Sequence, residues 1–415
     1  MHIFIYVIVA VIGLSLSFAH CYQFNAFNFS RCWRIIGRKP LFKKRYNRLT
    51  PLQSRAIPNQ RLRVAFGIDN AFTSHEEFRV KQFIVQAKSL INLSPTAWNL
   101  LSDIAHRAVR RSIKDTTANG HGEIKIRVMD LVQALTLRMV LQVLFSMEDE
   151  ALNLPDSCLI ELANAINITW INSKIKTTST PFENNSHLQE AILGIFPATQ
   201  DLNPQNNPLN MILPGFETMW RIAICMFIET GYTTGFQHPE WRTQLAAFAR
   251  TPSKAVFVQK VGIDNVSVEQ LVNEALRLYP PTKRVYRAFQ CYESSVSEVE
   301  AADIEGSHTA AHIWGSGAMF FDPKRWDALT STQKHAFIPF GKKPFVCPAQ
   351  SVFGPRVIGL IVGVLLMELG EDWTLKFIGS DGKDLRPETR LSNERNSYDC
   401  LYLTHGGNSF APQGN

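Results

Sequence analysis

The cysteine at position 347 lies in a loop that can hold a thiolate against a metal. Residues 337–349 read Phe-Ile-Pro-Phe-Gly-Lys-Lys-Pro-Phe-Val-Cys-Pro-Ala, and an apolar run of helix length, residues 352–369, follows directly. Backbone N–H groups of a tight turn and the positive end of a helix dipole both favour a charged thiolate. If the loop is taken alone, a buried and inert cysteine is the alternative interpretation.

Two upstream segments place charged side chains in a fixed order before this loop. Glu274 and Arg277 are three residues apart, on one face of a helix that the following Pro-Pro pair must end. Arg325 follows in the segment Phe-Asp-Pro-Lys-Arg-Trp, residues 321–326. An isolated Glu-x-x-Arg pair has little meaning, because such pairs are common on surface helices. Glu-x-x-Arg, then Pro-x-Arg-Trp, then Phe-Gly…Cys, taken in this order, resembles the C-terminal half of the cytochrome P450 family.

The resemblance continues upstream in residues 215–218, which read Gly-Phe-Glu-Thr. The resemblance implies that a small residue here leaves space beside a bound iron, and that the Glu217 carboxyl and the Thr218 hydroxyl relay protons to dioxygen. A helix interior with a hydrogen-bonded threonine is the alternative for the bare pattern. The resemblance extends from about Phe66 to the C terminus and is strongest over residues 207–369.

The resemblance implies a cofactor and a set of residue roles. The cofactor is haem b, and the Cys347 thiolate is its axial iron ligand, which promotes cleavage of the O–O bond. The remaining roles are Phe340 in the haem loop; Glu274, Arg277 and Arg325 as a buried charge triad; Arg287, or its neighbour Arg284, as a ligand of a haem propionate; Thr282, Lys283 and Val285 at the substrate pocket; and Glu217 and Thr218 in catalysis.

The chain departs from the family pattern at several positions. Lys343 replaces a glycine that is common in the haem loop, and Phe345 replaces the Arg or His that usually binds a propionate. Pro214 stands at the usual alanine position of the distal helix, where it removes a backbone N–H and favours a kink. No Trp-x-x-x-Arg propionate motif is evident, and residues 78–81 are a poor substitute. The lost propionate contacts are therefore expected elsewhere, or haem binds less tightly.

The region before residue 67 is short for the family. About twenty residues separate a basic run from the segment of residues 67–72, which leaves too little room for the family's first sheet and early helices. We expect a compact natural variant, an incomplete gene model or a decayed paralogue.

Composition and charge limit the class of protein. The chain has 415 residues, 45% of them hydrophobic, and can bury a large core within one domain. Its seven cysteines show no paired metal-ligand spacing, which favours a reducing compartment and one special thiol. The net charge is +7, and residues 31–48 carry eight Lys or Arg and no acid. Because no recognition motif accompanies this run, we expect no nucleic-acid partner.

The N-terminal segment predicts a membrane anchor. Residues 3–19 are apolar and uncharged, at the short end of what spans a bilayer, and the basic run that follows places the rest of the chain in the cytosol. We expect a single-pass anchor of the endoplasmic reticulum membrane at residues 1–24, a basic linker at 25–50 and a haem-binding catalytic domain at 51–415. A cleaved secretory signal is the alternative, because Ser17 and Ala19 suit a cleavage site.

The globular part reads as mostly helical. Apolar periodicity predicts helices over residues 76–93, 98–113, 128–145 and 159–175, and short strands over 285–289 and 398–403. Residues 181–210 read as a polar stretch that interrupts the helices. The fold class is therefore mainly α with small β-sheets, as in the cytochrome P450 fold, with an N-terminal sheet region that is possibly incomplete.

These observations predict a haem-thiolate monooxygenase that inserts one atom of dioxygen into a lipophilic small molecule. NADPH–cytochrome P450 reductase is the expected electron donor. The Leu-Pro-Gly-x-Glu-Thr and Phe-Gly-Lys-Lys-Pro-Phe variants are similar to those of fungal members that act in secondary-metabolite biosynthesis. A truncated, non-catalytic paralogue and an electron-independent isomerase or dehydratase are the alternatives.

Overall fold

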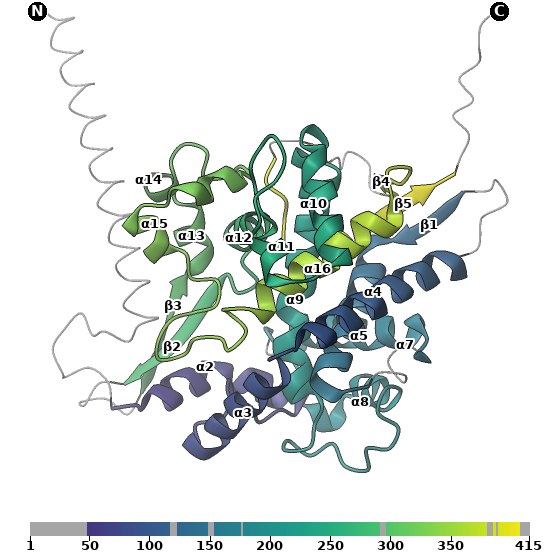
Figure 1. Ribbon diagram of the computed structural model, residues 1–415. Coiled ribbons are helices and arrows are strands. Elements are labelled where there is room, and N and C mark those ends of the chain that lie inside the picture. The colour runs from purple at the N-terminus through teal and green to yellow at the C-terminus, as the bar shows by residue number, and fades with distance from the viewer. Residues whose placement is uncertain are drawn as a thin grey trace, which may run out of the picture.

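The computed structural model describes residues 48–116, 123–147, 153–175, 177–290, 296–379, 385–386 and 389–406. Over these residues the protein is mostly helical with small sheets, so the predicted fold class is confirmed (Figure 1). The predicted anchor and nearly all of the basic linker lie outside the described residues.

Ten of the described α-helices have eight or more residues and another four are shorter. The longer helices are α2 (Pro51–Phe66), α3 (Glu77–Leu90), α4 (Pro95–Asp115), α5 (Val128–Phe145), α7 (Asp156–Asn172), α8 (Ser186–Leu193), α9 (Leu209–Gly231), α10 (Pro239–Arg250), α12 (Val268–Leu278) and α16 (Phe353–Leu369), where α8 is the shortest of them. The shorter ones are α11 (Lys254–Val258), α13 (Ile304–Thr309), α14 (Ala311–Trp314) and α15 (Ser331–Ala336), with 3-10 turns at Phe182–Asn184, Thr234–Gln237 and Pro323–Asp327.

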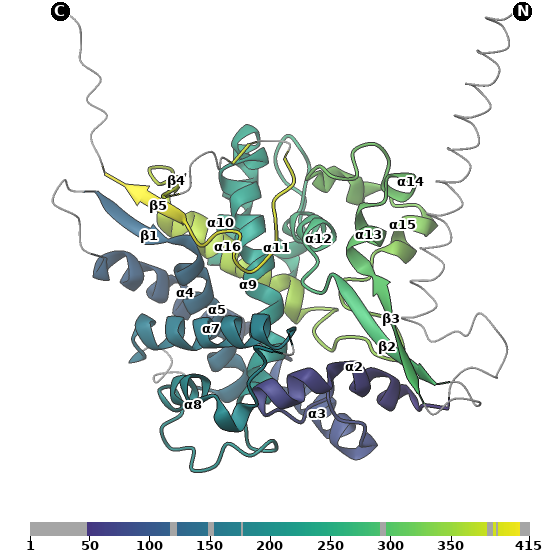
Figure 2. The same cartoon turned by 180° about the vertical axis from the view of Figure 1, so that it is seen from behind.

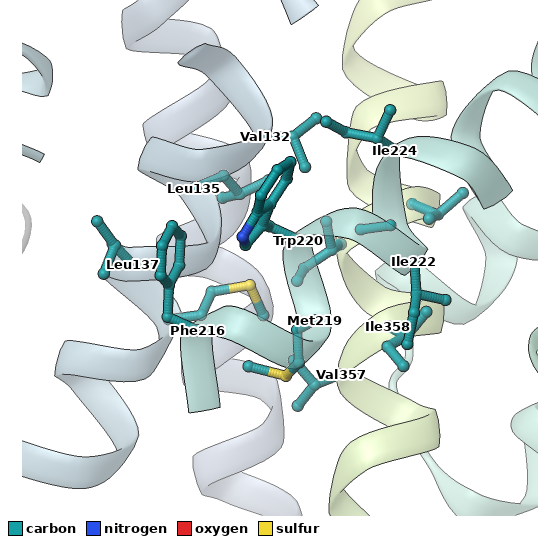
Figure 3. Packing of buried hydrophobic residues seen from close by; sticks show 14 of the residues in the cluster. Val132, Leu135, Leu137, Phe216, Met219, Trp220, Ile222, Ile224, Val357 and Ile358 are labelled. Atoms are coloured by element: carbon teal, nitrogen blue, oxygen red, sulfur yellow. The ribbon is translucent and has the colours of Figure 1, made fainter. Parts of the chain in front are cut away.

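Helices α5, α9 and α16 form the centre of the core. Their sequences are apolar on most sides, and nearly every residue of α5 is buried. Figure 3 shows their side chains packed together, with Trp220 of α9 turned toward Val132 and Leu135 of α5. A Cβ on Gly363 of α16 would lie 2.3 Å from the carbonyl oxygen of Leu245, so the glycine is what allows α10 to pack so closely.

Two helical segments, α5 and residues 209–237, are long and apolar enough to cross a membrane by composition. Both are mostly buried within the protein, 78% and 72% of the respective windows. A buried core helix of a large domain has the same composition as a membrane span. Their apolar character is therefore explained by core packing.

The strands form two small antiparallel sheets, and both views show these sheets on opposite sides of the helical body (Figures 1 and 2). One sheet has the order β1-β5-β4, from Ile124–Arg127, Leu401–His405 and Thr374–Phe377. The other pairs β2 (Arg284–Gln290) with β3 (Ser297–Asp303), and Arg287 stands opposite Glu300. The two predicted strands correspond to β2 and β5. The other three were not predicted, because they are short and carry too few apolar residues for a period-two pattern.

The described region before residue 67 contains one helix, α2. Thr50 and Gln53 form a capping box at the start of α2, and Gly67 ends the helix with φ +59°. Helix α2 packs against β2, where the Ser54 hydroxyl donates to the Ala288 carbonyl at 2.7 Å. This contact brings α2 to the strand that follows the Glu-x-x-Arg helix.

The stretch of residues 181–210 is less irregular than predicted. It contains a 3-10 turn at Phe182–Asn184 and helix α8 before α9 begins. The Asn185 side chain caps α8 by accepting from the Leu188 N–H. The clustered Asn and Ser residues act here as helix caps as well as loop formers.

Candidate functional site

The loop that carries Cys347 is closed on itself just ahead of α16. The Cys347 N–H donates to the Phe340 carbonyl at 2.9 Å, and the Phe345 N–H donates to the Lys342 carbonyl at 2.9 Å. Gly341 has φ +72°, and a Cβ there would lie 2.8 Å from the Phe345 carbonyl oxygen. The Phe-Gly pair is therefore needed for the turn that presents Cys347.

Cys347 is half-buried in its loop. Burial raises its pKa, and the backbone N–H of Ala349 partly opposes this effect. A thiolate in such a place needs a further positive charge, which a bound metal ion supplies. By comparison, Cys225 is fully buried in the core, where burial raises its pKa to about 12, so it stays a thiol.

The three residues predicted as a charge triad are brought together. Glu274 binds Arg277 through two contacts of 2.9 and 2.7 Å, and the Arg325 Nε lies 2.9 Å from Glu274 Oε1. Glu274 and Arg277 are fully buried. The Trp326 indole N–H and the Asp322 backbone N–H also donate to the Glu274 carboxylate, both at 3.0 Å. This carboxylate is fully hydrogen-bonded, which is the condition for a buried ion pair to be tolerated.

A buried histidine links the triad to the start of the cysteine loop. Arg277 Nη1 donates to the His308 carbonyl at 2.8 Å, and the Ile338 backbone N–H donates to His308 Nε2 at 3.0 Å. Burial, and then the Arg277 charge, lowers the pKa of His308 to about 3, so the ring is neutral and can accept this bond. His308 was not singled out in the sequence, since no motif marks it.

Two buried arginines lie on the ring of Phe345, two residues before Cys347. The guanidinium of Arg55 is 4.0 Å from the ring centre and that of Arg287 is 5.0 Å from it. Arg55 Nε and Nη2 are buried without a hydrogen-bond partner among the described residues. Burial and the nearby charge of Arg287 lower the pKa of Arg55 to about 10. Two buried cations at one ring, with the donors of Arg55 unused among the described residues, suit an anionic group.

The other candidates near this pair take different positions. Arg284 is exposed at the first residue of β2, so the structure places Arg287 and not Arg284 beside the cysteine loop. Residues 78–81 lie on α3, where Arg79 is engaged with Asp69 and Glu76 at 2.7 and 2.6 Å.

The predicted pocket residues lie at the start of the same strand. Thr282 is exposed, and Lys283 pairs with Glu394 at 2.6 Å. Val285 packs against the small apolar cluster of Ala302, Ile304 and Ile338. Packing accounts for Val285, and the pocket role of these residues stays a prediction.

The Gly-x-Glu-Thr segment lies on α9, which continues through Pro214. The Thr218 hydroxyl donates to the Pro214 carbonyl at 3.0 Å, and Thr218 is half-exposed. Gly215 faces α5, where a Cβ would lie 3.3 Å from the Val140 side chain. Glu217 is buried and ion-paired with Arg395, a partner that the sequence analysis missed.

These residues fit a haem with an axial thiolate. Cys347 supplies a sulfur donor with one backbone N–H directed at it, and the Arg55–Arg287 pair supplies buried cations that an iron porphyrin's propionates would neutralise. The main support for this fit is the buried donors of Arg55, because they have no hydrogen-bond acceptor among the described residues.

Comparisons with known proteins agree with this geometry. No family model matches the chain. It is 28% identical over 151 residues to "Putative cytochrome P450 cyp-13B1" of Caenorhabditis elegans, which covers 30% of this chain and 28% of that protein. It is also 27% identical over 186 residues to cytokinin hydroxylase of Arabidopsis thaliana. This match covers 40% of this chain and 35% of that protein. The matched region thus spans about a third of the length of these curated relatives.

Among solved structures, the fold is similar to the haem domain of a cytochrome P450 mutant. The TM-score is 0.52 at 17% sequence identity, over 88% of this chain and 83% of that chain. The chain therefore has the fold of a cytochrome P450 haem domain, and the curated relatives support the family resemblance found in the motifs.

Proposed function

We propose that the protein is a haem-thiolate monooxygenase that inserts one oxygen atom of dioxygen into a lipophilic small molecule. The observation that carries this proposal is the closed loop of Cys347, anchored through His308 to the fully hydrogen-bonded Glu274. Such a loop holds one thiol in a fixed place before a helix N terminus, which is what an axial metal ligand requires.

The cofactor and the residues that hold it follow from the site. Haem b supplies activation of dioxygen when it is bound. Cys347 would ligate its iron, and Arg55 and Arg287, which both lie at the Phe345 ring, would hold the propionates. Arg55 thereby replaces the propionate contact that is lost where Phe345 stands instead of an Arg or His.

Thr218 and Glu217 divide the proton handling on α9. The half-exposed Thr218 hydroxyl donates a hydrogen bond to the Pro214 carbonyl. The lone pairs of its oxygen can therefore accept from a proton donor and orient it. The Glu217 carboxylate is engaged by the Arg395 guanidinium in this arrangement. Its part in proton transfer requires an exchange of the Arg395 contact for a water or substrate contact.

The finer features rest on the sequence resemblance. We place the substrate in fungal secondary-metabolite biosynthesis, electron supply with NADPH–cytochrome P450 reductase, and the catalytic domain of residues 51–415 on the cytosolic side of the endoplasmic reticulum membrane. The haem-loop and distal-helix variants support the first of these, and the apolar segment followed by basic residues supports the last.

The reduced, carbon-monoxide difference spectrum of the purified chain tests the function. We expect the spectrum of thiolate-ligated haem in the wild type and its complete loss in Cys347→Ala. Cys158→Ala is the matched control, because Cys158 is half-buried on α7 and has no part in the site. A thiolate spectrum that persists in Cys347→Ala disproves the proposed function.

A further inference from the structure

Four basic side chains from distant parts of the sequence gather at one place beside α9. They are Arg61 of α2, Lys174 just after α7, Arg221 of α9 and Arg395 of the C-terminal segment, and we call them the cationic cluster. Figure 2 shows α2, α7 and the yellow C-terminal segment meeting around α9.

Contacts with α7 hold two members of the cluster together. The guanidinium groups of Arg61 and Arg395 lie 5.5 and 4.6 Å from the centre of the same Trp170 ring. Arg61 Nη1 donates to the Ser173 hydroxyl at 2.7 Å, and Arg395 Nη1 donates to Asn167 Oδ1 at 2.8 Å. The two arginines thus line one side of α7.

The cationic cluster has too few acids to balance it. Glu217 pairs with Arg395, and Glu394 is shared with Lys283 at 2.6 Å. Burial and then Arg395 lower the pKa of Arg221 to about 10, and Arg395 also lowers the pKa of Lys174 after burial. The cations therefore repel one another across this region.

Donors in the cluster are left unused. Asn167 is buried, and its Nδ2 has no hydrogen-bond partner among the described residues. Arg61 makes one hydrogen bond through Nη1, and the Lys174 ammonium makes none within the described chain. An anion placed here gains several charge-assisted hydrogen bonds and relieves the repulsion.

The position of the cluster connects it to the substrate side of the proposed enzyme. Arg221 Nη2 donates to the carbonyl of Pro281, the residue before Thr282, and Arg395 binds the Glu217 that precedes Thr218. Lys174 is exposed, Arg61 is half-buried and Arg395 is buried, so positive charge continues from the surface inward. Such a series of charges guides an anionic group toward a buried site.

We propose that the cationic cluster binds the anionic group, a carboxylate or a phosphate, of an otherwise lipophilic substrate. This inference rests on the proposed function, because only an enzyme has a substrate. It names the chemical class of substrate that the enzyme accepts. A neutral ligand would leave the repulsion between Arg61, Arg221 and Arg395 uncompensated, and would gain nothing from the Asn167 amide.

Calorimetric titration of the purified full chain tests the inference with three probes that share one alkyl chain: decanoate, decyl phosphate and 1-decanol. We expect at least one anion to bind about tenfold or more tightly than the alcohol, since each charge-assisted hydrogen bond supplies that factor or more. Comparison of decanoate with decyl phosphate identifies which anion the cluster prefers.

The double variant Arg61→Gln Lys174→Gln assigns the effect to the cluster. It should lose most of the preference for the anion while its affinity for 1-decanol stays unchanged. Lys334→Gln is the control, because Lys334 is exposed on α15 and its removal changes the charge of a remote helix. Equal affinity for all three probes, including no binding of any, disproves the inference, as does an equal loss in Lys334→Gln.

This titration is independent of the haem spectrum. An anion preference that survives without a thiolate spectrum supports the cluster and rejects the proposed function. A thiolate spectrum with no anion preference gives the reverse result.

Discussion

Single side chains decide which charges lie next to the cysteine loop. Arg55 was not recognised in the sequence, because one arginine in a polar helix has no distinguishing pattern. In the structure it is 7% exposed and stacked on Phe345, and two of its donor atoms have no hydrogen-bond partner in the described part of the chain. Unused buried donors carry a large desolvation cost, which a bound anion offsets.

We expect Arg55→Gln to weaken haem retention. The variant loses a buried cation from the propionate site, so haem should dissociate roughly tenfold or more faster, the effect of about one charge-assisted hydrogen bond. The transfer of haem to excess apomyoglobin measures this rate. Arg63→Gln, on the same helix, is the control. The Arg63 side chain is 40% exposed, and its Nη2 lies 3.9 Å from Asp69 Oδ2, which is a weak contact. Equal dissociation rates in both variants would show that Arg55 serves packing alone.

The neutral state of His308 predicts acid sensitivity. Its pKa is about 3 in the folded protein and 6.5 in the unfolded chain, so the unfolded state binds the extra proton between these values. The stabilising contribution is complete above about pH 6.5 and is lost as the pH falls toward 3, by up to about 1.4 kcal/mol for each pH unit.

His308→Gln should therefore be less stable at pH 7 but should show a shallower loss of stability between pH 6.5 and 4. Urea unfolding at several pH values measures both effects. His187→Gln is the control, because His187 is an exposed residue of α8 whose ring contacts Glu161 at 2.5 Å. An unchanged slope in His308→Gln would mean that another group carries the acid response.

At the scale of elements, the Glu274 carboxylate joins three segments. It binds Arg277 within α12 and Arg325 of the Pro323–Asp327 turn, and Arg277 in turn donates to the carbonyls of His308 and Ala318. The loop of Cys347 begins at Ile338, whose N–H binds His308. The triad therefore supports the cysteine loop at a distance, through one histidine.

Glu274→Gln should be destabilised by about 3–5 kcal/mol, because it leaves the buried Arg277 without its counter-charge. The expected result is insoluble or haem-free protein, and not a soluble enzyme of lower activity. Glu269→Gln is the control, since Glu269 is an exposed residue in the first turn of the same helix. Soluble, haem-loaded Glu274→Gln at the wild-type yield would contradict this role.

At the scale of the whole molecule, the distribution of charge bears on the proposed encounter with an electron donor. The chain carries a net charge of +7, and the cysteine loop exposes Lys343 with Lys342 half-buried beside it. Opposite charges on two proteins raise their association rate, and salt screens this effect over about 8–10 Å.

The double reversal Lys342→Glu Lys343→Glu should slow reduction by NADPH–cytochrome P450 reductase about tenfold or more and flatten its dependence on ionic strength. Oxidation driven by added peroxide should stay nearly unchanged. Stopped-flow reduction at several salt concentrations measures the first effect. Lys114→Glu Lys376→Glu, which reverses two exposed charges on α4 and β4, is the control. Equal losses in the reductase-driven and peroxide-driven reactions would show that the lysines support the loop itself.

The sequence by itself determined the parts that depend on local order. The spacing of Glu274, Arg277, Arg325 and Cys347 identified the fold, and the structure brings the first three together. The long apolar helices were predicted near their observed bounds, because amphipathic and core helices have strong periodic patterns. For α5 the predicted and observed bounds, residues 128–145, are the same.

Only the tertiary structure decided which distant side chains meet. Arg55 approaches Phe345 because α2 packs on β2, and Arg395 reaches Glu217 across 178 residues of sequence. The residues next to a charged residue in the sequence do not indicate its partner. An arginine at the surface and an arginine in a buried ion pair can stand in similar local sequences. Burial and long-range packing supply the desolvation that makes such a residue a binding group, and neither is present until the chain has folded.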